Sequence, residues 1–409
     1  MRIFIGTEEI ASLLTDLAYG FKKLGIPVTT YKRSHNKFYA LNKYDISRGN
    51  LLNSVFKYEN WKFLTKNNRY YLERLDEIIS TPYLKLKNRK LINQHDVFIF
   101  IWRPWLHESY LFPLLKKKGK KIICIHVGTD VRHISAFKQQ YQIDTSNWED
   151  YFQTDPLDSK IMKVRYHELY ADLIYSVPDQ AGLYIRGYNH FWLSLSKDKN
   201  IVFNIPARKV PLIIHAPSRA GIKGTDIIKK NLDQLKNDGY KFEYKLIQDL
   251  PNNQLLQLLT NTDILCDELF LHGPGMLGAE AMAAGCAVAT RCLNAFPFQP
   301  PVCAVTPENL YEKLKLLITD IDYRVALATA GKKFVDEFND PLKIAQKILD
   351  DMALNDKQDY QPHFFVEKFR LPENIRLSEQ TKSLTGEVIE KLGLQNESST
   401  YELKKRGLT

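Results

Sequence analysis

Strand-like and helix-like segments alternate twice along this 409-residue chain, and this alternation restricts its fold more than any other feature. The first unit begins at Arg2–Ile5, an apolar run typical of a buried strand, and continues with apolar residues at helical spacing in Ile10–Leu24. Gly25 and Pro27 end that helix, and Val28–Tyr31 predicts the next strand. A strand, a helix and a second strand in this order form a βαβ unit, so we expect a parallel sheet.

The alternation is interrupted and then resumes. Residues 34–90 are rich in Lys, Asn, Tyr and Phe, and we interpret them as an insertion with a helix at Tyr71–Ile79. The first series then continues with expected strands at Asp96–Ile101, Lys121–Ile125 and Leu173–Ser176 and a helix near Leu111–Lys117. A second series begins at Pro211. Its expected strands are Leu212–Ala216, Tyr244–Ile247, Asp263–Cys266 and Ala287–Thr290, and its expected helices are Asp226–Leu235, Leu255–Leu259, Ala279–Ala284, Asn309–Ile318 and Tyr323–Phe338.

The two series predict an α/β protein with two doubly wound, Rossmann-like domains that face each other across a cleft. We place the first domain at residues 1–200 and the second at 207–340, followed by a closing helix at 341–353 and a charged tail at 354–409. Ligands of such sheets bind beyond the carboxyl ends of the strands. The loops that follow the strands are therefore the candidate binding elements.

Composition excludes some classes of function. Lys and Arg number 57 against 47 Asp and Glu, a net charge of +10, which suits an anionic ligand or an anionic membrane surface. Zinc-finger spacings and RNA-binding aromatic signatures are missing, so nucleic acid is not an expected partner. No signal peptide and no run of about 18 apolar residues is present, which indicates a cytoplasmic protein. The five cysteines form no CxxC pair. The basic run at residues 116–121 is either a solvated helix end or a peripheral contact with the inner face of the membrane.

The first loop of the second domain has the composition of a phosphate-binding element. It follows the strand that ends at Ala216, enters a helix near Asp226, and carries Arg219 and Lys223 four residues apart. Its glycines allow tight turns, and a pyrophosphate needs both localised positive charge and close backbone approach. The alternative is an ordinary loop with two solvated cations.

The second loop joins a strand to a helix of small residues. Gly273, Gly275 and Gly278 let the main chain approach a ligand, and the following helix presents free N–H groups that favour a phosphate. Glu280 lies near the start of this helix, where its carboxylate could accept two hydrogen bonds from a ribose diol. The alternative is that Glu280 only stabilises the start of the helix.

The segment Gly278–Val288 closely resembles the EAMA-x-G-x-PV segment of glycosyltransferase family 4, and the loop with Arg219 and Lys223 lies upstream at a suitable distance. The resemblance covers residues 210–340 well and the first domain more loosely. It implies the GT-B fold and a retaining glycosyltransferase that uses a nucleotide-sugar as substrate, without a cofactor or a bound metal. It also implies a carbohydrate, lipid-linked or other hydroxyl acceptor.

The resemblance also implies roles for individual residues. Arg219 and Lys223 would hold the donor diphosphate and stabilise the leaving nucleotide, and Glu280 would hold the ribose. Gly275, Met276 and Leu277 would present backbone amides to the donor. The other donor-binding candidates are Ser218, Gly224, His272 and Gly273.

His272 departs from the pattern. The family usually has Glu, seven residues and then Glu, and counting back from Glu280 places His272 at the first Glu. An imidazole cannot reproduce the two acceptor oxygens of a carboxylate, although the neighbouring Asp267 and Glu268 could partly substitute. We therefore expect altered contacts to the donor sugar. A catalytically altered protein that binds nucleotide-sugars or serves as a scaffold is the alternative.

The first domain contributes a loop that starts at His126. The segment His126–Arg132 resembles the family's H-G-x-D-x-R with one additional residue, which places His126, Asp130 and Arg132 around the acceptor or the reacting sugar. The alternative is a packed loop with an internal Asp–Arg pair. Gly6 and Thr7 follow the first predicted strand and are weaker candidates for the cleft.

Overall fold

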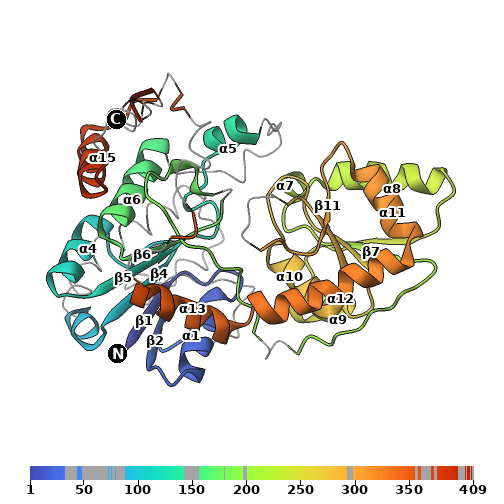
Figure 1. The fold of residues 1–409 in the computed structure, drawn as a ribbon, viewed down its shortest axis with the longest axis horizontal. Coiled ribbons are helices and arrows are strands. Elements are labelled where there is room, and N and C mark those ends of the chain that lie inside the picture. Colours follow the sequence, from blue (N-terminus) through green and yellow to red (C-terminus); the bar gives the residue numbers. More distant parts are fainter. Residues whose placement is uncertain are drawn as a thin grey trace.

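The computed structural model describes residues 1–32, 44–47, 88–141, 156–178, 180–196, 200–292, 298–354, 358–360, 370–372 and 375–394, with single residues at 72, 75, 79, 401, 403–405 and 407. Most of the insertion predicted at 34–90, including all but three residues of the helix expected at Tyr71–Ile79, lies outside the described residues. The rest forms two α/β domains that lie side by side (Figure 1).

In the described part of the chain, the first sheet has six parallel strands in the order β3-β2-β1-β4-β5-β6. Chain order reverses between β1 and β4, as in a doubly wound fold. The strands are β1 (Ile3–Thr7), β2 (Val28–Lys32), β3 (Ile46–Ser47), β4 (Val97–Ile101), β5 (Lys121–Ile125) and β6 (Leu173–Tyr175).

Both faces of this sheet are buried, which explains the uninterrupted apolar runs of its strands. Successive residues of a strand point to opposite faces. Ile99 therefore packs with the cluster around α1 (Leu13–Lys23), while Phe98 and Phe100 pack with the cluster on the other face. The second face is covered by α4 (Glu108–Lys117) and α6 (Leu157–Tyr170). Two shorter elements lie nearby, α5 (Ile134–Tyr141) and η3 (Ala181–Leu183).

The second sheet has five parallel strands among the described residues, in the order β11-β10-β9-β7-β8. Chain order reverses between β7 and β9, so the loops after these two strands flank the crevice where a ligand is expected. They are the two loops selected from the sequence. The strands are β7 (Leu212–His215), β8 (Glu243–Leu246), β9 (Ile264–Cys266), β10 (Ala287–Thr290) and β11 (Cys303–Ala304).

Helices cover both faces of the second sheet. On one face, α8 (Thr225–Asn237) and α11 (Leu310–Thr319) pack against the strands. On the other face lie α9 (Asn252–Leu259), α10 (Met276–Ala284) and α12 (Ile321–Phe338). Helix α12 packs closely on α10 at Gly331, because a Cβ added there would lie only 3.0 Å from Cγ of Met282.

After α12 the chain returns to the first domain, as Figure 1 shows. Helix α13 (Pro341–Leu354) packs against α1, and α15 (Glu379–Lys391) packs against α6. The closing helix expected at 341–353 therefore belongs to the packing of the first domain. Part of the charged tail is also ordered against that domain, where Arg165 Nε donates to Thr385 Oγ1 at 3.2 Å.

The remaining differences from the predicted elements are local. A short helix, α7 (Ala220–Lys223), occupies part of the segment expected to be a loop. Strand β1 extends through Thr7, so Gly6 and Thr7 lie within the strand and not in the loop after it. The five cysteines are free thiols, and no helix within the described ranges is both long and apolar enough to cross a bilayer.

Candidate functional site

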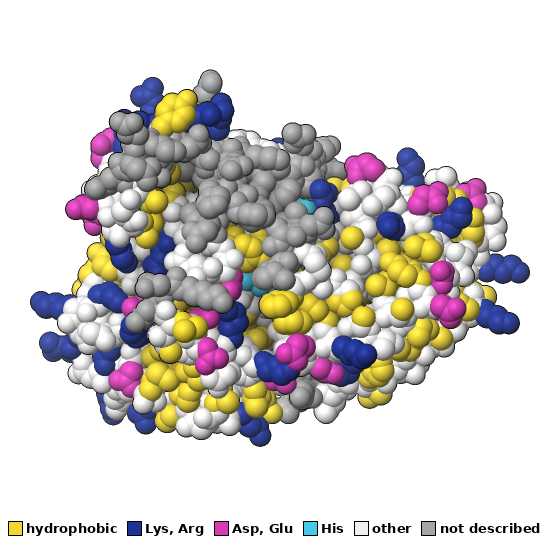
Figure 2. Space-filling model, viewed as in Figure 1, with side chains coloured by type: hydrophobic (Ala, Val, Ile, Leu, Met, Phe, Trp, Pro, Cys, Tyr) yellow, Lys and Arg dark blue, Asp and Glu magenta, His cyan; other side chains and the backbone are white. Residues whose placement is uncertain are grey.

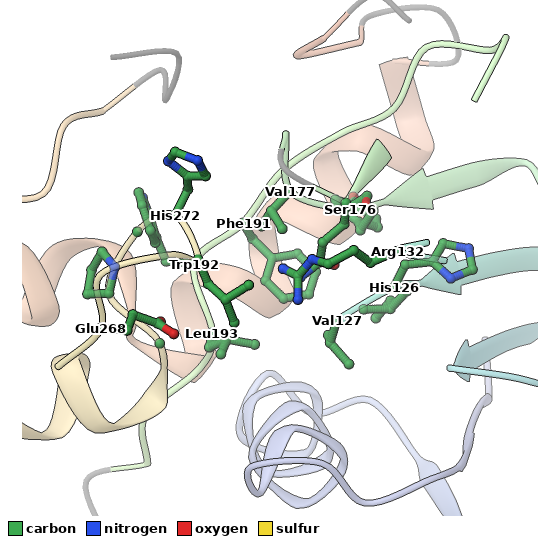
Figure 3. A pocket seen from close by; sticks show the side chains of 17 residues that line it. His126, Val127, Arg132, Ser176, Val177, Phe191, Trp192, Leu193, Glu268 and His272 are labelled. Atoms are coloured by element: carbon green, nitrogen blue, oxygen red, sulfur yellow. The ribbon is translucent and has the colours of Figure 1, made fainter. Parts of the chain in front are cut away.

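A pocket lies between the two domains, with a cavity of about 160 Å³. It is located beyond the carboxyl ends of β5, β6 and β9, where a doubly wound sheet binds its ligands. The first domain and the segment leading out of it contribute Ile125, His126, Val127, Arg132, Tyr175, Ser176, Val177, Gln180, Phe191, Trp192 and Leu193. The second domain contributes Glu268, Leu271, His272, Gly273, Pro274 and Gly275 (Figure 3).

The loop after β9 leads directly into the N-terminus of α10. Gly275 precedes the helix and has no side chain that could cap its N-terminus. Gly273 adopts a left-handed conformation with φ of 82°. The N–H of Gly273 donates to the carbonyl of Arg291 at 2.8 Å, which ties the loop to the end of β10. Met276 and Leu277 are the first residues of α10, where their amides can face an anion.

Lys223 lies beside the pocket in a cluster of buried charges. Its Nζ is 2.8 Å from Asp267 Oδ1 and 3.2 Å from Glu268 Oε2. Burial alone would lower the pKa of Lys223, but the two carboxylates outweigh burial and raise its pKa above the ordinary value. Burial and the charge of Asp267 raise the pKa of Glu268 to about 7, against the opposing charges of Lys223 and Arg132. The lysine is therefore a fixed cation at the carboxyl end of β9.

The loop after β7 is held in place by a buried histidine. His215 contacts the carbonyl of Cys266 through Nδ1 at 2.8 Å and Thr225 Oγ1 through Nε2 at 2.8 Å. These contacts join β7, β9 and the start of α8. Gly224 lies between α7 and α8 with φ of +75°, and a Cβ there would come within 2.8 Å of Leu269. Arg219 lies exposed at the start of α7.

The predicted ribose contact lies farther back along α10. Glu280 is only 2% exposed, and Asn252 Nδ2 lies 3.2 and 3.3 Å from its two carboxylate oxygens. Asn252 begins α9 and was not selected from the sequence. Arg219, Lys223 and Glu280 do not line the pocket, whereas His272, Gly273 and Gly275 do. The roles of all six residues toward a donor stay predictions.

His272 is 9% exposed and lines the pocket close to positive charge. Burial and then the charges of Arg291 and Arg132 lower its pKa to about 3. The ring is therefore neutral at physiological pH. The position at which the resemblance implies a carboxylate carries a neutral group.

His126 was expected to face the cleft, but both of its ring nitrogens are used within the first domain. Nδ1 lies 2.7 Å from Asp130 Oδ2, and Nε2 lies 3.0 Å from Nδ1 of His167. His167 Nε2 in turn lies 3.5 Å from Glu108 Oε1. Figure 3 shows the imidazole of His126 turned away from the pocket. His126 therefore lines the pocket, as expected, with both ring nitrogens bound within the first domain, and its role toward the acceptor stays a prediction.

Asp130 and Arg132 also differ in their surroundings. The internal partner of Asp130 is His126, not Arg132, and Gly128 N donates to its second oxygen at 2.9 Å. Burial raises the pKa of Asp130, but the contact with His126 outweighs it and the net shift is downward. Arg132 lines the pocket, and Figure 3 shows its guanidinium extending toward Glu268 on the opposite side. Among the three first-domain candidates, Arg132 is the one whose charged group points into the pocket.

Gly6 and Thr7 do not line the pocket. Thr7 is fully buried, and its hydroxyl donates to the carbonyl of Arg103 at 2.5 Å. The hydroxyl therefore holds the loop after β4 to β1.

The basic run at 116–121 is partly neutralised. Lys116 Nζ and Lys121 Nζ lie 2.9 and 3.6 Å from Asp172 Oδ1. On the face shown in Figure 2, basic and acidic side chains are interspersed. A contact of this run with a membrane stays a prediction.

No group of three or more His, Cys, Asp or Glu residues is arranged to hold a metal ion within the described ranges.

Comparison with known proteins finds no matching family model and no matching curated protein. Solved structures do match. Sucrose-phosphate synthase from Thermosynechococcus elongatus is 11% identical, with a TM-score of 0.57 over 86% of this chain and 98% of that chain. The catalytic domain of starch synthase IV from Arabidopsis thaliana, bound to ADP and acarbose, is 9% identical, with a TM-score of 0.55 over 87% and 99%. An alpha-glucosyltransferase in complex with UDP-glucose and DNA containing an abasic site is 11% identical, with a TM-score of 0.54 over 86% and 99%.

At these identities the likeness concerns the fold. It spans both domains and nearly the whole of each matched chain. The strand orders, the parallel pairing and the position of the pocket agree with it. The fold predicted from the sequence is therefore confirmed: this chain has the GT-B fold, two facing Rossmann-like domains with a pocket between them.

Proposed function

We propose that the protein is a glycosyltransferase that moves a sugar from a nucleotide-sugar donor to a hydroxyl group of an acceptor. The observation that carries the proposal is the position of the pocket, which lies beyond the strand ends of both domains and beside the N-terminus of α10. Two structures that share the fold were solved with a nucleotide or a nucleotide-sugar, namely ADP and UDP-glucose. Both features suit a donor bound mainly by the second domain.

The donor diphosphate would bind between α10 and the two cations of the loop after β7. The N-terminus of α10 offers N–H groups and the positive end of a helix dipole. Lys223 remains charged because its pKa is raised, and an incoming diphosphate adds an anionic partner to those it already has. Glu280, held by Asn252, would accept hydrogen bonds from the ribose.

Transfer would proceed with retention and without a bound metal, as the resemblance to family 4 implies. Negative charge grows on the diphosphate as the bond to the sugar breaks, and Arg219 and Lys223 would stabilise it. The acceptor hydroxyl, on a glycan or a lipid-linked sugar, would attack the same face of the ring and pass its proton to an oxygen of the leaving diphosphate. The protein would then contribute positioning and electrostatic stabilisation.

Replacing Lys223 tests this assignment. We expect Lys223→Ala to lower kcat/KM for the donor about 10²-fold, by analogy with the loss of one oxyanion donor. Lys230→Ala is a matched control, because Lys230 is an exposed lysine of α8 outside the pocket. Turnover is measured as hydrolysis of a panel of nucleotide-sugars, and near-full activity of Lys223→Ala would contradict the assignment. Since this change leaves two buried carboxylates without their cation, Arg219→Ala tests the same diphosphate contact at an exposed position.

Calorimetry with UDP, GDP and ADP tests the proposal as a whole. Binding of at least one of them is expected, and no binding would contradict it. The neutral His272 at the position of an expected carboxylate supports a second candidate, a protein that binds nucleotide-sugars without transferring them. Nucleotide binding together with no turnover on the full donor panel would favour that candidate.

A further inference from the structure

We propose that Glu268 determines the specificity for the donor sugar by accepting a hydrogen bond from one of its hydroxyl groups. This inference rests on the proposed function, because it assigns a partner to the sugar within the same pocket. The resemblance to family 4 implies a carboxylate at position 272, where this chain has His272. The structure supplies a carboxylate to the pocket from a residue four positions earlier.

The position of Glu268 carries the first step. It follows β9 by two residues, is 4% exposed, and lines the pocket. Among the described residues that line this pocket, Glu268 is the only one with a carboxylate. Figure 3 shows that carboxylate pointing into the pocket, toward the guanidinium of Arg132 from the first domain. A ligand in the cavity therefore meets one anionic group.

The carboxylate is also fixed in orientation. Lys223 Nζ lies 3.2 Å from Oε2, and a Cβ on Gly275 would lie 3.6 Å from Oε1. Oε1 therefore lies over the glycine turn that leads directly into α10. A diphosphate at the N-terminus of α10 would place the attached sugar next to this oxygen. The cationic Lys223 would then contact both the diphosphate and Glu268, the residue that binds the sugar hydroxyl.

His272 cannot replace this contact. Its ring is neutral, because burial and the charges of Arg291 and Arg132 lower its pKa to about 3, and a neutral imidazole has a single acceptor nitrogen. A carboxylate has two oxygens, so Glu268 can bind Lys223 with one and a hydroxyl with the other. Ion pairing with Lys223 offsets part of the desolvation of the buried carboxyl group, whose pKa stays raised to about 7.

Asp267 provides a matched comparison within the chain. Its Oδ1 lies 2.8 Å from the same Lys223 Nζ, it is 1% exposed, and it does not line the pocket. Asp267→Asn and Glu268→Gln therefore each remove one carboxylate next to Lys223. Glu268→Gln also removes the group that faces the sugar. A difference between the two variants isolates the contact to the sugar from any effect on Lys223.

The experiment compares, by calorimetry, the affinity for a nucleoside diphosphate with that for the matching nucleotide-sugar. For Glu268→Gln we expect the diphosphate affinity to change less than about threefold and the nucleotide-sugar affinity to fall about 10- to 100-fold, the range for a hydrogen bond to a charged group. Asp267→Asn should change both affinities by the same factor. Glu268→Asp, which keeps the charge but shortens the side chain, should give an intermediate loss for the nucleotide-sugar alone.

Deoxy-sugar donors complete the test. For the donor that lacks the contacted hydroxyl, wild-type protein and Glu268→Gln should bind with equal affinity. The inference is overturned if Glu268→Gln weakens both ligands equally, since it would then act through Lys223, or if it weakens neither. Wild-type protein that binds the nucleoside diphosphate but gains nothing from the sugar also overturns it. Wild-type protein that binds no nucleotide contradicts the proposed function itself.

Discussion

Each of several charged side chains near the pocket is held by a specific partner. Lys223 contacts Asp267, and Glu280 contacts Asn252. Side chains locked in this way lose little entropy when a ligand arrives, so they can act as preorganised contacts. His272 differs from these charged residues, because it presents a neutral ring to the pocket close to the positive charges of Arg291 and Arg132.

His272→Ala tests whether this neutral ring contacts the sugar. We expect about a tenfold loss of nucleotide-sugar affinity and of turnover, with little change in the affinity for the nucleoside diphosphate. Because the pKa of His272 is about 3, the ring does not titrate between pH 5.5 and 8, and the loss should be the same at both pH values. Calorimetry and donor hydrolysis at the two pH values measure this. Unchanged binding and turnover in the variant would contradict a contact with the sugar.

Among the secondary-structure elements, α13 and α15 stand out because they follow the second domain in sequence but pack on the first. The contact of α13 with α1 is close enough to require a glycine. A Cβ added to Gly20 would lie 2.1 Å from the carbonyl oxygen of Pro341. Gly386 of α15 has open space around it, since a Cβ there meets nothing within 4 Å.

The two glycines predict opposite effects of the same substitution. Alanine stabilises a helix interior by roughly 0.5–1 kcal/mol relative to glycine, and this gain should appear for Gly386→Ala. At Gly20 the clash with the Pro341 backbone should outweigh the gain, giving a net loss of about 1–3 kcal/mol. Urea unfolding measures both free energies. Equal stabilisation by the two variants would show that α13 does not pack on α1 as described.

The predicted elements agree with the structure where an apolar run is continuous, as in β5 and β10, whose bounds were predicted without error. Helix α6 was not predicted. Its buried residues include Arg165, His167 and Glu168, and polar residues on a buried face remove the apolar spacing by which a helix is recognised. Arg165 and Glu168 are buried because they pair with each other at 2.5 Å.

The candidate site was likewise predicted only in part from the sequence. Strand ends and glycine turns could be located from the sequence, because parallel strands place their carboxyl ends at one edge. The direction of a side chain could not. His126 directly follows β5 as expected, but its ring contacts His167 of the unpredicted α6. The ion pair between Glu268 and Lys223 joins two segments that lie 45 residues apart in the sequence. The spacing of residues within either segment therefore could not predict this contact.

At the scale of the whole molecule, the two domains are joined at two crossings that contact each other. Leu195 N donates to the carbonyl of Asn339 at 2.7 Å, and Asn339 Nδ2 donates to the carbonyl of Leu193 at 2.7 Å. Across the cleft, Phe137 of α5 packs against Ile222 of α7. The pocket is therefore bounded by contacts between the domains on more than one side.

The buried histidines should make the folded protein sensitive to acid. Burial lowers the pKa of His167 and His190 to about 4, and that of His272 to about 3, from an ordinary 6.5. Below pH 6.5 the unfolded chain takes up protons that the folded protein does not, so stability is lost as pH falls toward 4. From pH 7.5 to 5 the expected loss is about 2 kcal/mol for each histidine, measured by urea unfolding.

Glu268 opposes this effect. Its pKa, raised to about 7 from 4.5, contributes stability that is present at low pH and lost as pH rises through 7. Glu268→Gln removes the opposing group, and its stability should fall more steeply than that of the wild type between pH 7.5 and 5. Stability that stays constant or rises as pH falls through this interval would contradict the neutral state of the buried histidines.

A row of contacts links four buried side chains, and the hydrogens along it can be counted. The four residues are Asp130, His126, His167 and Glu108. The row has three contacts, and each needs one hydrogen between its two heavy atoms. Two neutral imidazoles bring two hydrogens, and the carboxylates at the ends only accept. These two hydrogens fill the contacts of His126 with Asp130 and with His167, and leave the contact between His167 Nε2 and Glu108 without one. Because the pKa of His167 is lowered to about 4, the wall of the pocket after β5 gains a hydrogen bond to α4 only in acid.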